Sequence, residues 1–230
     1  MNISDYKFKT ELHAHTNPAS PCSDFTPEDV IQRYRDIGYD SIVISNHFYP
    51  GMRFLGEKKK CIEAYLRDYE ESLAAGRKYG INVIFGCELR FTENINDYLI
   101  YGIDPEFADF AYDSMPKGLE EFSKNFRSEE HLIIQAHPYR DGMTEMPSGL
   151  IDGVEAFNLH PGHNSRVALA ARYAQKNNLI VTCGSDFHHE VHQGTAAFLT
   201  KTEVKSSRDI VDAIRNGAYL LEVGGYKLLP

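Results

Sequence analysis

The feature that most constrains this chain is a set of short apolar segments that end in residues able to bind a metal ion. Such segments, rich in Val, Ile and Leu, have the length and composition of buried strands. Longer stretches with a helical spacing of apolar residues separate them, so strands and helices alternate. The expected strands are 8–13, 41–45, 82–86, 98–103, 132–136, 153–157, 179–183 and 219–223, and the expected helices are 27–37, 57–78, 118–126, 165–176 and 207–215.

An alternation of strands and helices is compatible with an open doubly wound sheet or with a closed barrel. A glycine-rich phosphate-binding loop after the first strand would favour the open sheet, and the sequence has no such loop. Polar residues instead follow several strands at their carboxyl ends, where a parallel barrel gathers its active site. We therefore expect an α/β barrel, and we expect residues 1–230 to form one domain because no internal repeat or linker interrupts them.

Two of the expected strands end in pairs of residues with the same spacing. The first ends with His13 and His15, which project from one face because alternate residues of a strand do so. The sixth full-length strand leads into Asp186 and His188. Surface or core histidines and a helix-capping Asp would explain either pair alone. Their repetition at the same place relative to a strand favours a shared metal site.

Three more strands each lead into one ionisable residue: His47, Glu88 or His137. Burying an isolated polar side chain there costs on the order of 2–7 kcal/mol, and coordination of a metal ion removes that cost. A carboxylate such as Glu88 can also bridge two hard or borderline cations. Five strand ends of this kind predict a centre with more than one metal ion.

At these residues the chain resembles the PHP superfamily, the polymerase and histidinol phosphatase family of metal-dependent phosphoesterases. The resemblance extends over residues 11–194 and implies a distorted TIM-like (β/α)7 barrel with two or three Mn, Fe or Zn ions at its mouth. The motifs that carry it are His13-Ala14-His15-Thr16, Ser45-Asn46-His47, Gly86-Cys87-Glu88, Ala136-His137-Pro138 and Gly184-Ser185-Asp186-Phe187-His188.

The resemblance also implies how seven ligands divide among the ions. The first ion would be bound by His13, His15 and Asp186. The second would be bound by His137 and by Glu88, which would also bridge to the first ion. The third would be bound by His47 and His188.

Three positions depart from the family pattern. Many members have a His or Asp ligand for the third ion soon after the first motif, and in this chain the segment after that motif is longer. Asp24 is our candidate for this ligand, and a role in a turn or a helix cap is the alternative. A further His ligand is absent after the bridging Glu, and Asp97 near its position is either an oxygen ligand or a turn-forming residue. Asn46 replaces a common Asp, which would alter a hydrogen bond around the site but remove no ligand.

We expect hydrolysis of a small phosphomonoester, of the histidinol-phosphate type, by a water activated between two metal ions. Arg140 and Arg166 follow ligand-bearing or strand-end segments and are candidates to bind the phosphate, although surface ion pairs would explain them equally well. His188 and His160 are candidates to protonate the leaving oxygen. Together with the bridging Glu88, they complete the candidate catalytic set.

Two other functions remain open from the sequence. Amidohydrolase-type deacylases also begin with a His-x-His strand and end with an Asp, but they commonly bridge their ions with a modified Lys, and no Lys ends an expected strand here. The second alternative is a metal-binding regulatory domain that has lost activity, which Asn46 and the uncertain third-ion ligand suggest. Related PHP domains also process the ends of nucleic acids.

The charge and the termini of the sequence bear on partners and location. A net charge of −9 disfavours a nucleic-acid-binding face. The N-terminal residues do not form a signal peptide, and no apolar segment has membrane-spanning length. The four cysteines are scattered, as is common in a reducing compartment. We therefore expect a cytoplasmic protein with a small phosphorylated substrate and no membrane partner, in an oligomeric state that the sequence does not specify.

Overall fold

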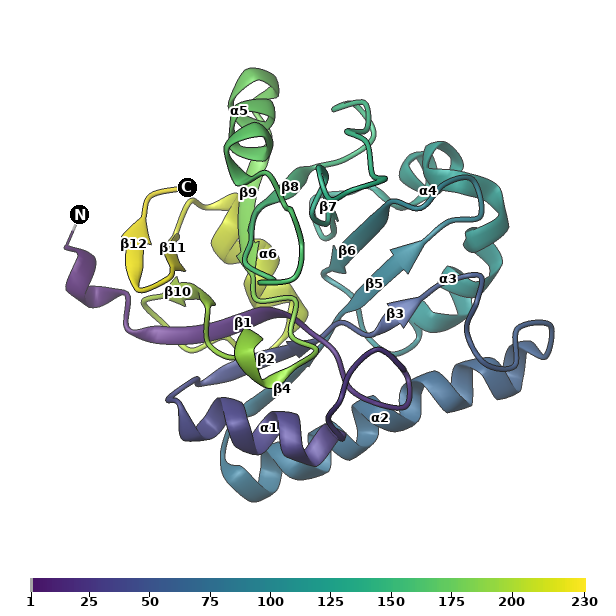
Figure 1. Ribbon diagram of the computed structural model, residues 1–230, viewed down its shortest axis with the longest axis horizontal. Helices are drawn as coiled ribbons and strands as arrows, with labels where there is room; N and C mark the ends of the chain where they lie inside the picture. Colours follow the sequence, from purple (N-terminus) through teal and green to yellow (C-terminus); the bar gives the residue numbers. More distant parts are fainter. Residues whose placement is uncertain (1) are drawn as a thin grey trace.

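Two mixed six-stranded sheets form the framework of the computed structural model, which describes residues 2–230 (Figure 1). The strand order is β12-β11-β10-β1-β2-β4 in the first sheet and β3-β5-β6-β7-β8-β9 in the second. The strands of the first sheet are β1 (Phe8–Ala14), β2 (Ser41–Ile44), β4 (Asn82–Phe85), β10 (Ala196–Thr200), β11 (Tyr219–Val223) and β12 (Tyr226–Leu228), and those of the second are β3 (His47–Phe48), β5 (Cys87–Arg90), β6 (Asp97–Tyr101), β7 (Leu132–Gln135), β8 (Gly153–Asn158) and β9 (Ile180–Gly184).

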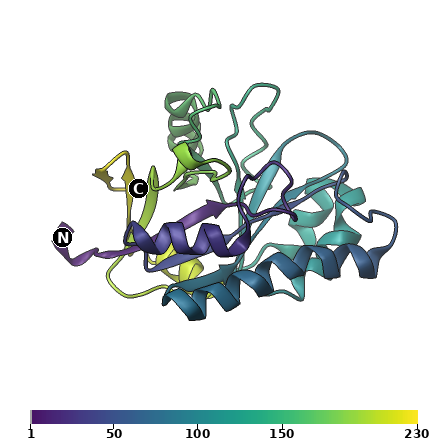
Figure 2. The same ribbon diagram turned by 60° about the horizontal axis from the view of Figure 1, so that its bottom comes forward.

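Six α-helices are described between these strands, and the apolar side of each packs toward a sheet. Helix α1 begins at a capping box in which the side chains of Thr26 and Asp29 each accept from the backbone N–H of the other, with Pro27 in its first turn. Helices α1 and α2 lie side by side along one edge of the molecule (Figures 1 and 2). The helices are α1 (Pro27–Asp36), α2 (Lys58–Tyr79), α3 (Phe107–Ser114), α4 (Gly118–Phe126), α5 (Val167–Asn177) and α6 (Ser207–Arg215), and short 3₁₀ helices span Ile3–Asp5, Met115–Lys117 and Glu190–His192.

The pairing of the strands is less uniform than the sequence predicts. Parallel pairs join β1 to β2, β2 to β4, β3 to β5, β7 to β8 and β8 to β9. Antiparallel pairs join β1 to β10, β10 to β11, β11 to β12, β5 to β6 and β6 to β7. Within residues 2–230 the ladders form two sheets, so the expected single (β/α)7 ring is not confirmed. The coarser prediction of an α/β fold is confirmed.

The chain crosses from the first sheet to the second at two bends. β2 continues into β3, and β4 continues into β5 after Gly86 alone. A Cβ atom at Gly86 would collide with the Val43 side chain, so only glycine allows the close approach of the two strands there. One isolated parallel bridge, between Ala14 and Phe187, joins the end of β1 to the segment that follows β9.

Apolar residues from both sheets meet in the interior below this junction. One cluster contains Leu12 and Val43 from the first sheet together with Leu99 and Ile134 from the second, all at most 1% exposed. Two further clusters lie beneath the helices, one under α1 and α2 and one under α2 to α5. This shared core fixes the strand ends of the two sheets relative to one another.

Most of the expected elements are present, with bounds shifted by one or two residues. Strand β11 and helices α4 and α6 have the predicted bounds. The sequence analysis missed β3, β5, β10, β12 and α3. Among the described helices, none has the length and apolar composition needed to cross a bilayer.

Candidate metal centre

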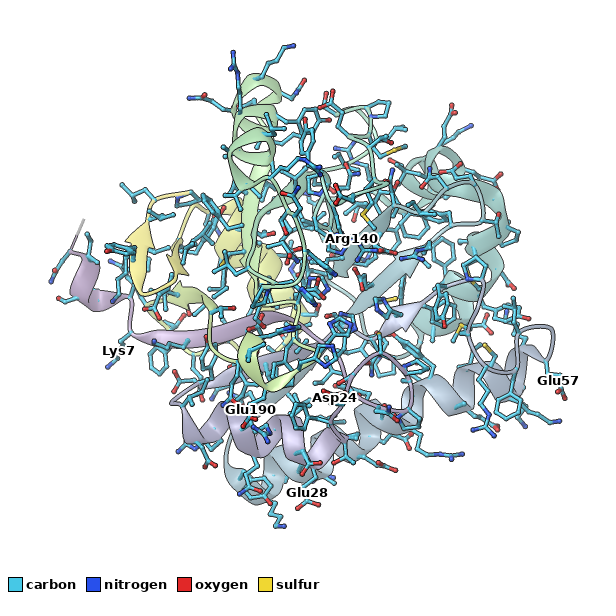
Figure 3. The ribbon with its side chains drawn as sticks, in the orientation of Figure 1. Lys7, Asp24, Glu28, Glu57, Arg140 and Glu190 are labelled. Carbon is cyan, nitrogen blue, oxygen red and sulfur yellow. The ribbon has the colours of Figure 1, made fainter. Side chains whose placement is uncertain are left out.

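Seven of the eight predicted metal ligands lie together at the junction of the two sheets. His13 and His15 stand at the end of β1, His47 begins β3, Glu88 lies in β5, His137 follows β7, and Asp186 and His188 follow β9. All except His47 are buried, and the His47 side chain is 17% exposed. Figure 3 shows the nitrogen-bearing rings gathered near the centre of the molecule, between the labels of Arg140 and Asp24.

The Glu88 carboxylate lies among four imidazoles. Its Oε1 is 3.0 Å from His137 Nε2 and 3.5 Å from His13 Nε2. Its Oε2 is 2.5 Å from His47 Nδ1 and 3.4 Å from His15 Nε2. Burial raises the pKa of Glu88, but the charges of His47 and His13 outweigh that effect and hold the pKa well below its usual range. Glu88 is therefore an anion in the folded protein, as a bridging ligand must be.

Asp186 is the second anion of the centre. Its Oδ1 lies 3.5 Å from His13 Nε2, 3.4 Å from His15 Nε2 and 3.3 Å from His188 Nδ1. Although burial raises the pKa of Asp186, the His13 charge and the neighbouring imidazoles hold it well below its usual range. Asp186 has φ +51° and His137 has φ +29°, backbone conformations that residues other than glycine rarely adopt. Strain of this kind is concentrated at functional sites.

The unpartnered atoms of the centre show that its residues fit metal ions. Nε2 of His13 and Nε2 of His15 are buried and have no hydrogen-bond partner, although most buried polar atoms in proteins have one. The potential ligand atoms fall into groups of three that lie within 4.8 Å of one another. These groups are His13, His15 and Glu88; His13, His137 and Asp186; Glu88, Asp97 and His137; His15, His47 and His188; and His160, His188 and His192.

Two buried residues that the sequence analysis did not select orient the His13 and His15 rings. Glu155 Oε1 lies 2.8 Å from His13 Nδ1, and Ser20 Oγ lies 3.2 Å from His15 Nδ1. Such a hydrogen bond at Nδ1 leaves Nε2 to face the ion. A side chain at Gly184 would collide with His13 and with Glu155, so this glycine lets them meet. The sequence feature that could have identified Glu155 is its charge within an otherwise apolar expected strand, 153–157.

Two of the remaining candidates, Asp97 and Arg166, have other partners in the structure. Asp97 is buried and accepts two hydrogen bonds from Arg90, at 2.6 and 2.7 Å, while its carboxylate also lies near Glu88 and His137. Arg166 is 2.5 Å from Asp141 and donates to a backbone carbonyl. Arg140 is half-buried.

The segment after β1 is arranged differently from the sequence interpretation. Asp24 is exposed and lies 2.6 Å from His189 Nδ1, outside the groups of potential ligands. Cys22, which the sequence analysis treated as an isolated cysteine, instead has its side chain within hydrogen-bonding reach of His47 and His188. Burial raises the pKa of the Cys22 thiol, but the hydrogen bonds with His188 and His47 outweigh it and lower the pKa to about 6.

Comparison with known proteins identifies the family of this centre. The sequence profile of the PHP domain matches residues 11–223. The chain belongs to the PHP domain family. No curated protein matches it.

Two solved structures share this fold. A structure from Bacteroides vulgatus ATCC 8482, described as a two-domain protein containing a predicted PHP-like metal-dependent phosphoesterase, is 16% identical with a TM-score of 0.63. The match covers 93% of this chain and 64% of that one. PsfC from Pseudomonas syringae PB-5123 is 14% identical with a TM-score of 0.59, and the match covers 89% of this chain and 87% of that one. At these identities the likeness establishes the fold alone.

Proposed function

We propose that this PHP-family chain is a metal-dependent phosphoesterase that hydrolyses a small phosphomonoester of the histidinol-phosphate type. The observation that carries the proposal is the pair of buried, unpartnered Nε2 atoms of His13 and His15, which face the anions Glu88 and Asp186. Two imidazole nitrogens between two buried carboxylates form a donor set that suits a divalent cation, which would take the place of the proton that the carboxylates otherwise hold on His13. The description of the Bacteroides structure is consistent with this activity.

The proposed centre holds two or three Mn, Fe or Zn ions in the division that the family resemblance implies. The ligands would be His13, His15, Asp186, Glu88, His137, His47 and His188, with Asp24 as a further candidate from the sequence. When bound, the ions would activate water for attack on phosphorus and neutralise charge on the phosphoryl oxygens. The protein supplies the fixed geometry and a mostly buried setting in which that charge acts strongly.

A proton donor for the leaving oxygen is the remaining chemical requirement. Burial lowers the pKa of His188, but hydrogen bonds and charge from Asp186 and Cys22 outweigh it and raise the pKa to about 9. Burial lowers the pKa of His160 to about 3. With no ion bound to it, His188 therefore keeps a proton at neutral pH and is a candidate donor, whereas His160 does not. As a ligand of the third ion His188 could not donate that proton, so its two proposed roles exclude one another.

A cavity beside the centre suits a small leaving group. It has a volume of about 330 Å³, and its lining includes Tyr49, whose ring packs edge-on against His47. Arg53 and Arg67 also line it, so it would accept an organic group with a negative charge. This volume is at the lower end for ligand pockets in proteins. Arg140 and Arg166 remain our candidates for binding the phosphate itself.

We also propose that the two sheets together form the distorted barrel of the family. The continuation of β2 into β3 and of β4 into β5 supports closure on one side, and the Ala14–Phe187 bridge supports it on the other.

The test is elemental analysis of gently purified protein together with a phosphate-release screen in added Mn²⁺, Fe²⁺ or Zn²⁺. Two or three ions per chain, with phosphate release that His13→Ala abolishes and His131→Ala retains, would support the proposal; His131 lies outside the centre. Cleavage of amides without cleavage of phosphoesters would favour the deacylase. Less than one ion per chain, with no activity in any metal, would favour the regulatory domain.

A further inference from the structure

The loop that follows β1 is anchored on both sides of Cys22 to the backbone of the metal centre. Before Cys22, the Ser20 hydroxyl accepts a hydrogen bond from the backbone N–H of His47 at 2.9 Å. After it, the backbone N–H of Asp24 donates to the carbonyl of His188 at 3.0 Å. The Ser23 hydroxyl also donates to the carbonyl of His15. These bonds fix the path of the loop and hold Cys22 on the side of the centre formed by His47 and His188.

A second, independent feature of this place is a buried ligand atom without a hydrogen-bond partner. His15 Nε2 is fully buried without a partner, and it belongs to the group of ligand atoms formed with His47 and His188. The His15 ring stacks on both of those rings, with centroids 4.3 and 4.2 Å away. Three imidazoles at this separation repel one another when protonated, and a cation between them removes the repulsion.

The neighbouring carboxylate is turned away from this group. The Asp24 side chain is 63% exposed and lies against His189. Its backbone is held to His188, so its carboxylate reaches the group only if the loop moves.

We propose that Cys22, rather than Asp24, completes the third metal site as a thiolate ligand beside His47 and His188. This inference rests on the metal centre of the proposed function. Coordination replaces the S–H bond by a sulfur–metal bond and releases the proton to solvent. A sulfur and two or three imidazole nitrogens form a donor set that favours Zn²⁺ or Fe²⁺, whereas Mn²⁺ prefers oxygen ligands. The third site therefore differs in metal preference from the oxygen-containing sites around Glu88 and Asp186.

The experiment is titration of the metal-free protein with Co²⁺, followed by absorption spectroscopy. A sulfur-to-cobalt charge-transfer band in the near ultraviolet is expected in the parent protein and in Asp24→Asn, and it should be absent in Cys22→Ser. Cys61, Cys87 and Cys183 are buried, and Cys87 alternates in β5 with Glu88, so it faces away from the centre. Visible Co²⁺ bands without a sulfur-to-cobalt charge-transfer band would overturn the assignment of Cys22 as a ligand, while the proposed metal centre would still stand. No Co²⁺ binding at all would overturn both.

Thiol labelling gives a second measurement that does not depend on activity. Cys22 is the exposed cysteine, so it should react first with a disulfide reagent in the metal-free protein. Saturating Zn²⁺ should slow that reaction at least about tenfold, because the ion occupies the sulfur lone pair. Asp24→Asn should show the same protection. An unchanged labelling rate in protein shown to contain Zn²⁺ would contradict ligation by Cys22.

Discussion

Replacement of Glu155 by Gln should weaken metal binding while leaving the fold intact. Glu155 is 1% exposed, and its Oε1 accepts from His13 Nδ1 at 2.8 Å. Its Oε2 accepts from the Asn158 side chain at 2.9 Å. The carboxylate thus holds a proton on Nδ1, so that Nε2 is the atom that faces Glu88 and Asp186 and binds a cation when it gives up its own proton, and the carboxylate charge makes the imidazole a stronger donor to that cation.

The magnitude follows from the hydrogen bond that changes. A bond to a charged acceptor contributes about 1.5–3 kcal/mol and a bond to a neutral acceptor about 0.5–1.5 kcal/mol. Glutamine retains an oxygen for His13 Nδ1, so the expected loss is the difference, about 1–2 kcal/mol. Because about 1.4 kcal/mol is a tenfold change in affinity, the dissociation constant for the most tightly bound ion should rise about five- to thirtyfold.

The assay is chelator competition for Mn²⁺ or Zn²⁺, with Glu120→Gln as the matched control. Glu120 is exposed on α4, far from the ligands in sequence, and its replacement should leave affinity unchanged. Thermal unfolding with chelator present checks that both variants fold. An affinity for Glu155→Gln within twofold of the parent protein would refute the reasoning that Glu155 orients and activates His13.

Two further predictions concern stability in the presence of chelator. Arg90→Ala leaves the buried Asp97 carboxylate without its cation, so the free energy of unfolding should fall by about 3 kcal/mol. The control is Arg208→Ala, which breaks an exposed pair with Asp212 and should lower the free energy of unfolding by less than about 1 kcal/mol. Equal losses for the two variants in denaturant titrations would contradict this prediction. Burial raises the pKa of Glu11 from 4.5 to about 7, so the stability from its retained proton is complete below pH 4.5 and is lost as the pH rises to 7. The loss of folding stability between pH 4.5 and pH 7 amounts to about 3 kcal/mol. Glu11→Gln should not show this pH dependence. Parallel curves of stability against pH for the parent protein and Glu11→Gln over this range would contradict the prediction.

The sequence was sufficient for the family and for most of the strand ends, because both depend on local patterns. The PHP resemblance is confirmed by the profile match, and the apolar segments that precede His13, His137 and Asp186 are strands. Strand β10 was missed because its Ala-rich segment has a weak β preference, and only pairing with β1 and β11 makes it a strand. The division into two mixed sheets depends on long-range pairing, which no local pattern specifies.

The arrangement around the ligands was harder to predict. Cys22 carried no motif, and it approaches His47 because Ser20 and Ser23 fold the loop back by hydrogen bonds to distant backbone. Asp24 is nearer the family pattern in residue type, and the same loop turns its side chain outward. Arg90 is likewise identified only by the β5–β6 pairing that sets it opposite Asp97.

The ligands at the centre come from opposite sides of the sheet junction. His13 and His15 extend from the first sheet, whereas His47, Glu88 and Asp186 belong to strands, or follow strands, of the second. An ion held among them would connect the two halves of the molecule, and at a hundred times its dissociation constant it would add about 2.7 kcal/mol to folding stability. We therefore expect metal supply to govern how long the protein survives proteolysis in the cell, so that starvation for metal removes the protein as well as its activity.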